Sequence, residues 1–121
     1  MMPVVKRCGK TFEIVYISLD DVLFTFMQGG TICYQTAYDV FSQISTVEEQ
    51  ERFLADYGFS RIERGYLARL DRAQEYDSQY GLLMFDGGLS APVSKPKETI
   101  LRDRLLRLKR NTADKPRYMF A

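Results

Sequence analysis

Apolar and polar residues alternate along several short stretches of this chain, which is the pattern of half-buried β-strands. The segment Thr11–Ile17 is rich in β-branched and aromatic residues and predicts a first strand. Val22–Met27 and Thr31–Thr36 predict two more strands, and they flank Gln28-Gly29-Gly30. Because paired glycines supply the positive φ angles of a tight turn, these two strands are expected to form a β-hairpin.

The same arrangement returns later in the chain. Tyr80–Phe85 and Leu89–Val93 predict strands on either side of a second glycine turn, Asp86-Gly87-Gly88. Ala37–Ile44 contains apolar residues without a clear period, so it fits either a strand or a helix. The pattern as a whole therefore predicts a mostly β fold with antiparallel hairpins.

A short helix is predicted between the two hairpins. Thr46 is followed three residues later by Glu49, which is the capping-box pattern of a helix start. The helix is expected to run to about Tyr57, because Gly58 then stands where helices end in a left-handed residue. Its inward-facing residues are expected to be Val47, Phe53 and Leu54.

The last predicted element is a basic helix that begins at Ser94-Lys95-Pro96. Proline suits the first turn of a helix, where its missing N–H costs no hydrogen bond. Leucines recur at helical spacing after it, at positions 101, 105 and 108. The helix is expected to end near Asn111, and residues 111–121 are expected to form a loose C-terminal tail.

Charge is distributed unevenly, although the net charge of the chain is only +1. Residues 1–94 carry 8 basic and 13 acidic side chains, a net charge of −5. Residues 95–117 carry 9 basic and 3 acidic side chains, a net charge of +6. This asymmetry is consistent with an anionic partner near the C-terminal segment, and equally with a solvated basic helix on an acidic domain.

Composition limits the chemistry that the chain can perform. Its 121 residues predict one domain spanning residues 1–121, with no signal peptide and no apolar stretch long enough for a membrane span. A cytoplasmic location without a membrane partner is expected. The chain has no histidine, and Cys8 and Cys33 lack metal-ligand spacing, so both thiols are expected to be reduced and structural. These absences argue against an enzyme, a metal site or a cofactor.

One run in the middle of the chain, Phe59–Leu70, combines residues of a buried sheet with closely spaced guanidinium groups. Its three arginines are Arg61, Arg64 and Arg69. Arginine binds phosphates and guanine edges through its planar, multidentate donor group. The run therefore predicts a contact with nucleic acid as well as a strand.

The run resembles the core motif of the LytTR family of bacterial DNA-binding domains, which typically reads Phe-x-Arg-Ile-His-Arg-Ser-Tyr-Leu-Val-Asn. Glu63 stands at the histidine position, Gly65 at the serine position, and Ala68-Arg69 replaces Val-Asn. Two flanking segments are also similar to the family, Ile17–Phe24 and Asp86–Lys95. The resemblance covers roughly residues 10–110. It implies an elongated stack of small antiparallel sheets, with one short helix and the basic C-terminal helix.

The same resemblance implies sequence-specific binding of duplex DNA by a small transcriptional regulator, here a stand-alone domain without a receiver domain. Loops of the family enter successive major grooves. The positions that would face DNA are Gln28, Gly30, Thr31, Arg64, Arg69, Ser94, Lys95 and Lys97. Arg64 would contact a guanine or a phosphate, whereas Arg61 is expected to brace the fold. Arg69 fits a phosphate contact and a solvent-exposed position over the sheet equally well.

An alternative reading has the module bind a protein instead of DNA. Glu63 places a carboxylate where phosphates would lie, and Pro96 occupies a position that is often basic in the family. A homodimer on paired DNA sites and a regulatory protein partner are both left open by the sequence. Aromatic residues that alternate along the strands could stack on bases, but the sequence favours a core role. They are Phe24, Phe26, Tyr34, Tyr66, Tyr80 and Phe85.

Overall fold

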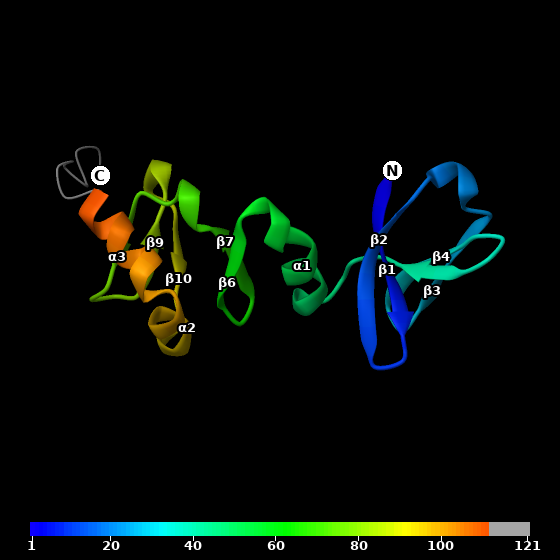
Figure 1. Ribbon diagram of the computed structural model, residues 1–121, viewed down its shortest axis with the longest axis horizontal. Helices are drawn as coiled ribbons and strands as arrows, with labels where there is room; N and C mark the ends of the chain where they lie inside the picture. Colours follow the sequence, from blue (N-terminus) through cyan, green and yellow to red (C-terminus); the bar gives the residue numbers. More distant parts are fainter. Residues whose placement is uncertain (112–121) are drawn as a thin grey trace. The chain divides into compact units, whose positions relative to one another are not determined.

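The computed structural model describes residues 1–111, with only the backbone described at residues 109–111. It divides the chain into two compact units, a first unit of residues 1–53 and a second unit that begins at Leu54 (Figure 1). The expected single domain over residues 1–121 stays a prediction. The expected loose tail lies outside the described residues, apart from Asn111 at its start, which ends the last helix.

The first unit is built on one antiparallel sheet with the strand order β2-β1-β5-β4-β3. Its strands are β1 (Met2–Cys8), β2 (Thr11–Ile17), β3 (Phe24–Gln28), β4 (Thr31–Gln35) and β5 (Val40–Ser42). The hairpin predicted around Gly29 and Gly30 is confirmed, with φ angles of 58° and 79° at the two glycines. The ambiguous segment Ala37–Ile44 contains β5, so the strand alternative is correct there.

Strand β1 was not predicted, yet it lies inside the sheet between β2 and β5. Val4 and Val5 are adjacent and are both fully buried. Successive residues of a strand point to opposite faces, so this pair is covered on both faces of the sheet. A strand buried on both faces does not alternate, and this removes the sequence signal on which the other strand predictions depend.

Helix α1 (Val47–Leu54) closes the first unit, and the predicted capping box is present at its start. The N–H of Glu49 donates to the Thr46 hydroxyl at 3.1 Å, and the N–H of Thr46 donates to the Glu49 carboxylate at 3.2 Å. The same buried carboxylate accepts from the N–H of Ser45 at 2.9 Å and from the Arg7 guanidinium of β1 at 2.6 Å. One side chain thus caps the helix and ties it to the sheet.

Burial alone would raise the pKa of Glu49, but the donors of Ser45, Thr46 and Arg7 outweigh it and hold the pKa below its usual range. We expect Glu49→Gln to lower the free energy of unfolding by about 2 kcal/mol at pH 7, because hydrogen bonds to a charged group are removed. A depressed folded-state pKa stabilises the fold above the unfolded value, near 4.5, and this contribution disappears as the pH falls.

The difference between wild type and Glu49→Gln in urea denaturation should therefore shrink as the pH is lowered from about 6 to about 3. The exposed Glu13 on β2 supplies the control, since Glu13→Gln should change stability little at either pH. Equal stability of wild type and Glu49→Gln at pH 7 would show that the buried carboxylate does not hold the helix.

The second unit contains a two-stranded sheet and a three-stranded sheet, both antiparallel, followed by two helices. Its elements after a short 3₁₀ turn (Ala55–Tyr57) are β6 (Phe59–Glu63), β7 (Tyr66–Arg69), β8 (Glu75–Asp77), β9 (Leu82–Met84), β10 (Ser90–Pro92), α2 (Lys95–Ile100) and α3 (Arg102–Asn111). Its core joins the hairpin, the three-stranded sheet and the helices through Ile62, Leu83 and Leu105, which are all almost fully buried.

The second unit differs from the prediction in two places. The basic helix is two helices, because Leu101 leaves the helical conformation at φ −98° and ψ 11°. Leu101 and Leu105 both belong to the core, and no glycine or proline marks the break between Lys97 and Asn111. Strand β8 was missed altogether. It pairs with β9 through only three residues, Glu75–Asp77, which is too short for a clear period.

The expected core role of the aromatic residues holds only in part. Phe24, Tyr66 and Tyr80 are exposed, whereas Phe26 and Phe85 are half-buried. Phe24 lies on an edge strand, and the other two lie at or next to turns, where one side of the ring has no neighbouring element. Alternation predicts which face a side chain takes, but it does not predict whether that face is covered.

The predicted fold class is confirmed: the chain is mostly β, with small antiparallel sheets and few helices. No helix within residues 1–111 is long and apolar enough to cross a membrane. The same residues contain no group of three or more cysteines, aspartates and glutamates that could hold a metal ion. Both cysteines are free thiols, with Cys33 buried and Cys8 exposed, so the structural role expected for Cys8 has no support from burial.

Candidate nucleic-acid interface

The turn between β6 and β7 holds the central arginines. The Arg61 guanidinium donates from Nε and from one terminal nitrogen to the carbonyl oxygen of Arg64, at 3.1 and 2.6 Å. The Glu63 carboxylate accepts from the backbone N–H of Arg64. Arg61 and Glu63 therefore fix the backbone of this turn, which is the bracing role expected for Arg61. The Arg64 side chain is exposed, and its guanidinium has no hydrogen-bond or ion-pair partner among the described residues.

The start of α2 is attached directly to this hairpin. The backbone N–H of Ser94 donates to the carbonyl oxygen of Ile62 at 2.8 Å. The hydroxyl of Ser94 caps α2 by accepting from the N–H of Lys97 at 3.4 Å, and Pro96 lies in the first turn as predicted. Ile62 lies in β6, two residues before Arg64 in the chain, so this bond holds the start of α2 next to the hairpin that carries Arg64.

Two lysines lie in the first turn of α2. Lys95 is largely exposed and lies 3.9 Å from the Glu98 carboxylate, which is a long and solvent-screened ion pair. Lys97 is half-buried. These two lysines lie at the start of the helix that the Ser94–Ile62 bond attaches to the hairpin of Arg64.

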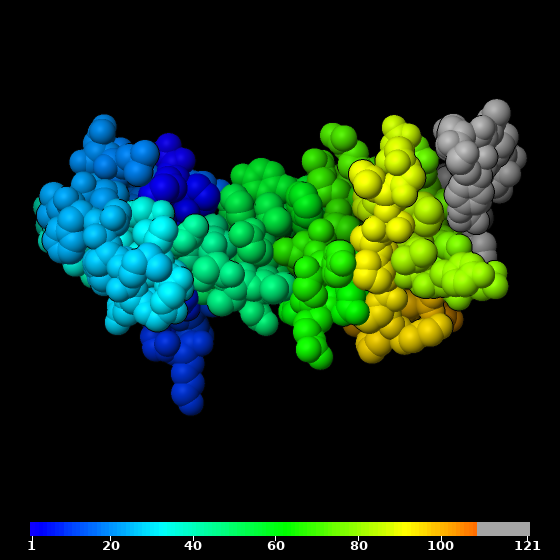
Figure 2. Space-filling view, turned by 180° about the vertical axis from the view of Figure 1, so that it is seen from behind, coloured from blue at the N-terminus to red at the C-terminus, as the bar shows by residue number. Residues whose placement is uncertain are grey.

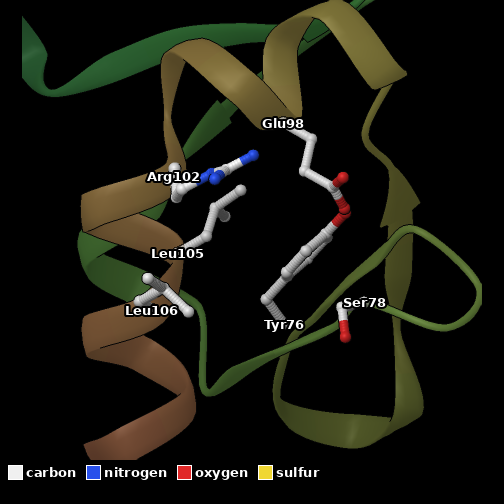
Figure 3. A pocket seen from close by; sticks show the side chains of 6 residues that line it. All are labelled: Tyr76, Ser78, Glu98, Arg102, Leu105 and Leu106. Carbon is white, nitrogen blue, oxygen red and sulfur yellow. The ribbon is translucent and has the colours of Figure 1, made fainter.

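Helix α2 is held against the three-stranded sheet by a pair that the sequence did not reveal. The hydroxyl of Tyr76 on β8 donates to the Glu98 carboxylate on α2 (Figure 3). Tyr76 is only 5% exposed, and burial, followed by the hydrogen bond to Glu98, raises its pKa. The pair borders an open pocket of about 300 Å³ whose other lining residues are Ser78, Arg102, Leu105 and Leu106.

Two other arginines of the second unit are engaged in the fold. Arg69 lies at the far end of the hairpin from Arg64, 5.7 Å above the Phe59 ring and 3.7 Å from Asp71. Arg104 on α3 donates to the hydroxyl of Ser60 on β6 at 3.0 Å. Arg69 thus lies away from the turn that holds Arg64, and its predicted phosphate contact stays a prediction.

The remaining predicted positions lie in the first unit, at the turn between β3 and β4. Gln28 and Thr31 close this turn as a cross-strand pair, and Gly30 lies within it. A Cβ atom added to Gly29 or Gly30 would meet no atom within 4 Å, so open space surrounds the turn. This space would let the turn approach a DNA groove closely. The positive φ angles are by themselves enough to explain why glycine occupies these two positions.

Sequence reasoning missed the two contacts that organise the site of the second unit. The bond from Ser94 to Ile62 joins backbone atoms, which carry no side-chain signature. Tyr76 and Glu98 are 22 residues apart, and Tyr76 belongs to the strand that was not predicted. Only an alignment showing that the two residues vary together could have found this pair.

Comparisons with known proteins indicate the family of the chain. A family model described as the LytTr DNA-binding domain matches residues 13–106 of the chain. Among solved structures, the chain is similar to the LytTr DNA-binding domain of a Bacillus cereus protein described as a methyl-accepting/DNA response regulator. That similarity has 18% sequence identity and a TM-score of 0.44, and it covers 85% of this chain and 95% of the other. A comparison with curated proteins finds no match.

Proposed function

The chain belongs to the LytTR family of DNA-binding domains, and from this membership we propose that it is a small bacterial transcriptional regulator that binds specific sequences in duplex DNA. The DNA-binding domain would comprise about residues 10–110, close to the range that the family model matches. Such a regulator binds DNA and catalyses no reaction, so the proposed function requires neither a catalytic group nor a cofactor. In a bacterium, the cytoplasm is where it would act.

One observation supports the proposed site most strongly. The bond from the Ser94 N–H to the Ile62 carbonyl holds the start of α2 beside the β6–β7 hairpin. Arg64, Lys95 and Lys97 then lie on adjoining elements, and the Arg64 guanidinium is not used within the described part of the fold. An exposed arginine on a braced turn is preorganised for a partner, because little conformational freedom of the backbone is left to lose on binding.

The three side chains would share the work of recognition. Arg64 would read bases, since a bidentate arginine contact to guanine is the commonest specific contact in the major groove. Lys95 and Lys97 would contact phosphates, which position the protein without reading sequence. Glu63 accepts from the backbone of its own turn, so its carboxylate has a structural role there. A second DNA contact would come from the first unit, through Gln28, Gly30 and Thr31. Arg69 would contact a phosphate separately from both groups.

The proposal is tested by a mobility-shift titration on the region upstream of the gene for this chain. We expect a discrete shifted band that a specific competitor removes at lower concentration than scrambled duplex of the same length. Equal competition by both duplexes would mean that binding is not sequence-specific. No shift on any fragment would favour the protein-binding alternative instead.

Helix α3 should contribute charge without reading sequence. Arg102 and Arg107 are exposed on it, whereas Arg104 is engaged with Ser60. We expect the double variant Arg102→Gln/Arg107→Gln to weaken binding to all duplexes alike and to reduce the salt slope by about 1 for each phosphate that the variant no longer neutralises. The measurement is fluorescence anisotropy on specific and random duplexes at several salt concentrations.

The control for this pair removes a positive charge elsewhere. Lys10 is exposed at the turn between β1 and β2, outside every proposed DNA segment. Lys10→Gln should leave the salt slope unchanged. If the arginine double variant also keeps the wild-type slope, α3 does not contact DNA, and its positive charge belongs to a solvated surface.

A further inference from the structure

The sheet of the first unit has an edge strand with an open side. The order β2-β1-β5-β4-β3 leaves β2 and β3 at the two edges. Strand β3 pairs with β4 from Phe24 opposite Gln35 to Gln28 opposite Thr31, and no strand within residues 1–111 pairs with its other side. Alternate backbone N–H and C=O groups of β3 therefore point away from the sheet without a strand partner.

Several side chains along this edge are both apolar and exposed. Leu23, Phe24 and Met27 are exposed by 65%, 56% and 64%. Alternation places Phe24 and Phe26 on one face of the sheet, and it places Met27 on the other face beside its cross-strand neighbour Ile32. Figure 2 shows the light-blue part of the chain that contains β3 open at the surface. Both faces next to the edge thus present apolar surface.

Strand β3 also lacks the features that usually protect an edge. Natural edges are blocked by charged side chains, prolines or bulges that turn the strand away. The segment Val22–Gln28 contains no charged residue, no proline and no glycine. The other edge strand, β2, differs because it carries the exposed carboxylate of Glu13. An unprotected, apolar edge is a template for one further strand.

We propose that β3 pairs antiparallel with β3 of a second copy of this chain and so joins two five-stranded sheets edge to edge. The free backbone groups need an extended strand as partner, which excludes a helix or a small molecule. Self-pairing about a two-fold axis uses both free edges at once and therefore closes at a dimer. No like charges meet across the new ladder, because Val22–Gln28 is uncharged.

The contact is small, which places it in the size class of weak and transient interfaces. One strand pair with its flanking side chains buries on the order of 1,000 Å² in total, at the low end of specific interfaces. We therefore expect reversible association with a dissociation constant on the order of 10 µM. The turn Gln28–Thr31 lies at the end of the hairpin, so pairing along its side leaves this turn accessible. The dimer requires no DNA and goes beyond the function proposed above.

The test is sedimentation equilibrium of the full chain without DNA, for wild type and three lysine variants. Thr25→Lys adds a charge to the exposed edge without removing an apolar side chain, and Met27→Lys adds one while removing exposed apolar surface. Leu89→Lys is the matched control, because Leu89 is 68% exposed in the second unit. Circular dichroism and thermal unfolding check that every variant is folded.

We expect a monomer–dimer equilibrium for wild type and Leu89→Lys, and association at least about tenfold weaker for both β3 variants. Amide hydrogen exchange should show protection of β3 that increases with protein concentration, which contact through side chains alone would not give. A monomer at every concentration would overturn the proposal and leave the edge to a strand of another protein. Dimers that both folded β3 variants keep at wild-type strength would overturn it too, as would open-ended aggregates.

Discussion

Arg64→Ala is expected to weaken binding to the specific site by about 5- to 150-fold, which corresponds to the roughly 1–3 kcal/mol of a good bidentate base contact. Binding to random duplex should fall much less, because Lys95, Lys97 and the other cations remain. The melting temperature should stay at the wild-type value, since the Arg64 guanidinium bonds to no described residue. Competition binding beside thermal unfolding measures both quantities.

Arg61→Ala is the matched variant, since it removes an arginine of the same turn. The Arg61 side chain donates twice to the Arg64 carbonyl, so its removal should lower the free energy of unfolding by roughly 1–3 kcal/mol. Part of the specific binding should disappear with it, because the turn that presents Arg64 is no longer braced. Wild-type operator binding by Arg64→Ala would show that the proposed reading residue is wrong, and the protein-partner reading would then be favoured.

Ile62→Ala is expected to lower the free energy of unfolding by about 2–5 kcal/mol, because it opens a cavity at a fully buried position. Ile62 lies in the core of the second unit, and its carbonyl accepts the bond from Ser94. Specific DNA binding should therefore fall along with stability. Urea denaturation followed by circular dichroism gives the stability change.

Ile62→Val is a milder variant at the same position. It removes only one methylene, so it should lower the free energy of unfolding by about 0.5–1.5 kcal/mol. Leu89→Ala is the control for a truncated apolar side chain, since Leu89 is exposed and its removal should change stability little. If Ile62→Ala unfolds at the wild-type urea concentration, the hairpin and α2 do not share a core, and the proposed site loses its scaffold.

The sequence predicted those parts of the fold whose signal is local. Gly29 and Gly30 marked the first hairpin because only glycine takes the φ angles of its turn without strain. Thr46 and Glu49 marked the start of α1 because a capping box is a pattern three residues long. Each of these features depends on neighbours in the chain, so one sequence contains the whole signal.

The parts that could not be predicted depend on neighbours distant in the sequence. The buried pair Val4–Val5 does not alternate, because the sheet is covered on both faces there. Leu101 interrupts the last helix at a core position whose neighbours are distant in the sequence. The exposure of Phe24 follows from its place on an edge strand, and strand order leaves no trace in the sequence of one strand.

The candidate site also has parts that the sequence predicts and parts that only the structure shows. Arg64 and Ser94–Lys97 could be found because each lies in a segment that resembles a family motif. The bond that brings them together could not be found, since it joins backbone atoms of Ser94 and Ile62. An orienting role of Glu63 towards the neighbouring arginines could also be inferred from the sequence, and the structure adds the atoms involved, because the Glu63 carboxylate accepts from the backbone N–H of Arg64.

We propose above that this chain binds duplex DNA through several phosphate contacts and through Arg64, which recognises bases. The most direct test of this claim is a fluorescence anisotropy titration of the wild-type chain on random duplex, from about 50 to about 200 mM salt. Replacing counterions at about four phosphates predicts that log Kobs falls linearly with log salt, with a slope of about −3 to −4. Absence of binding at the lowest salt, or binding that salt does not weaken, would contradict the claim.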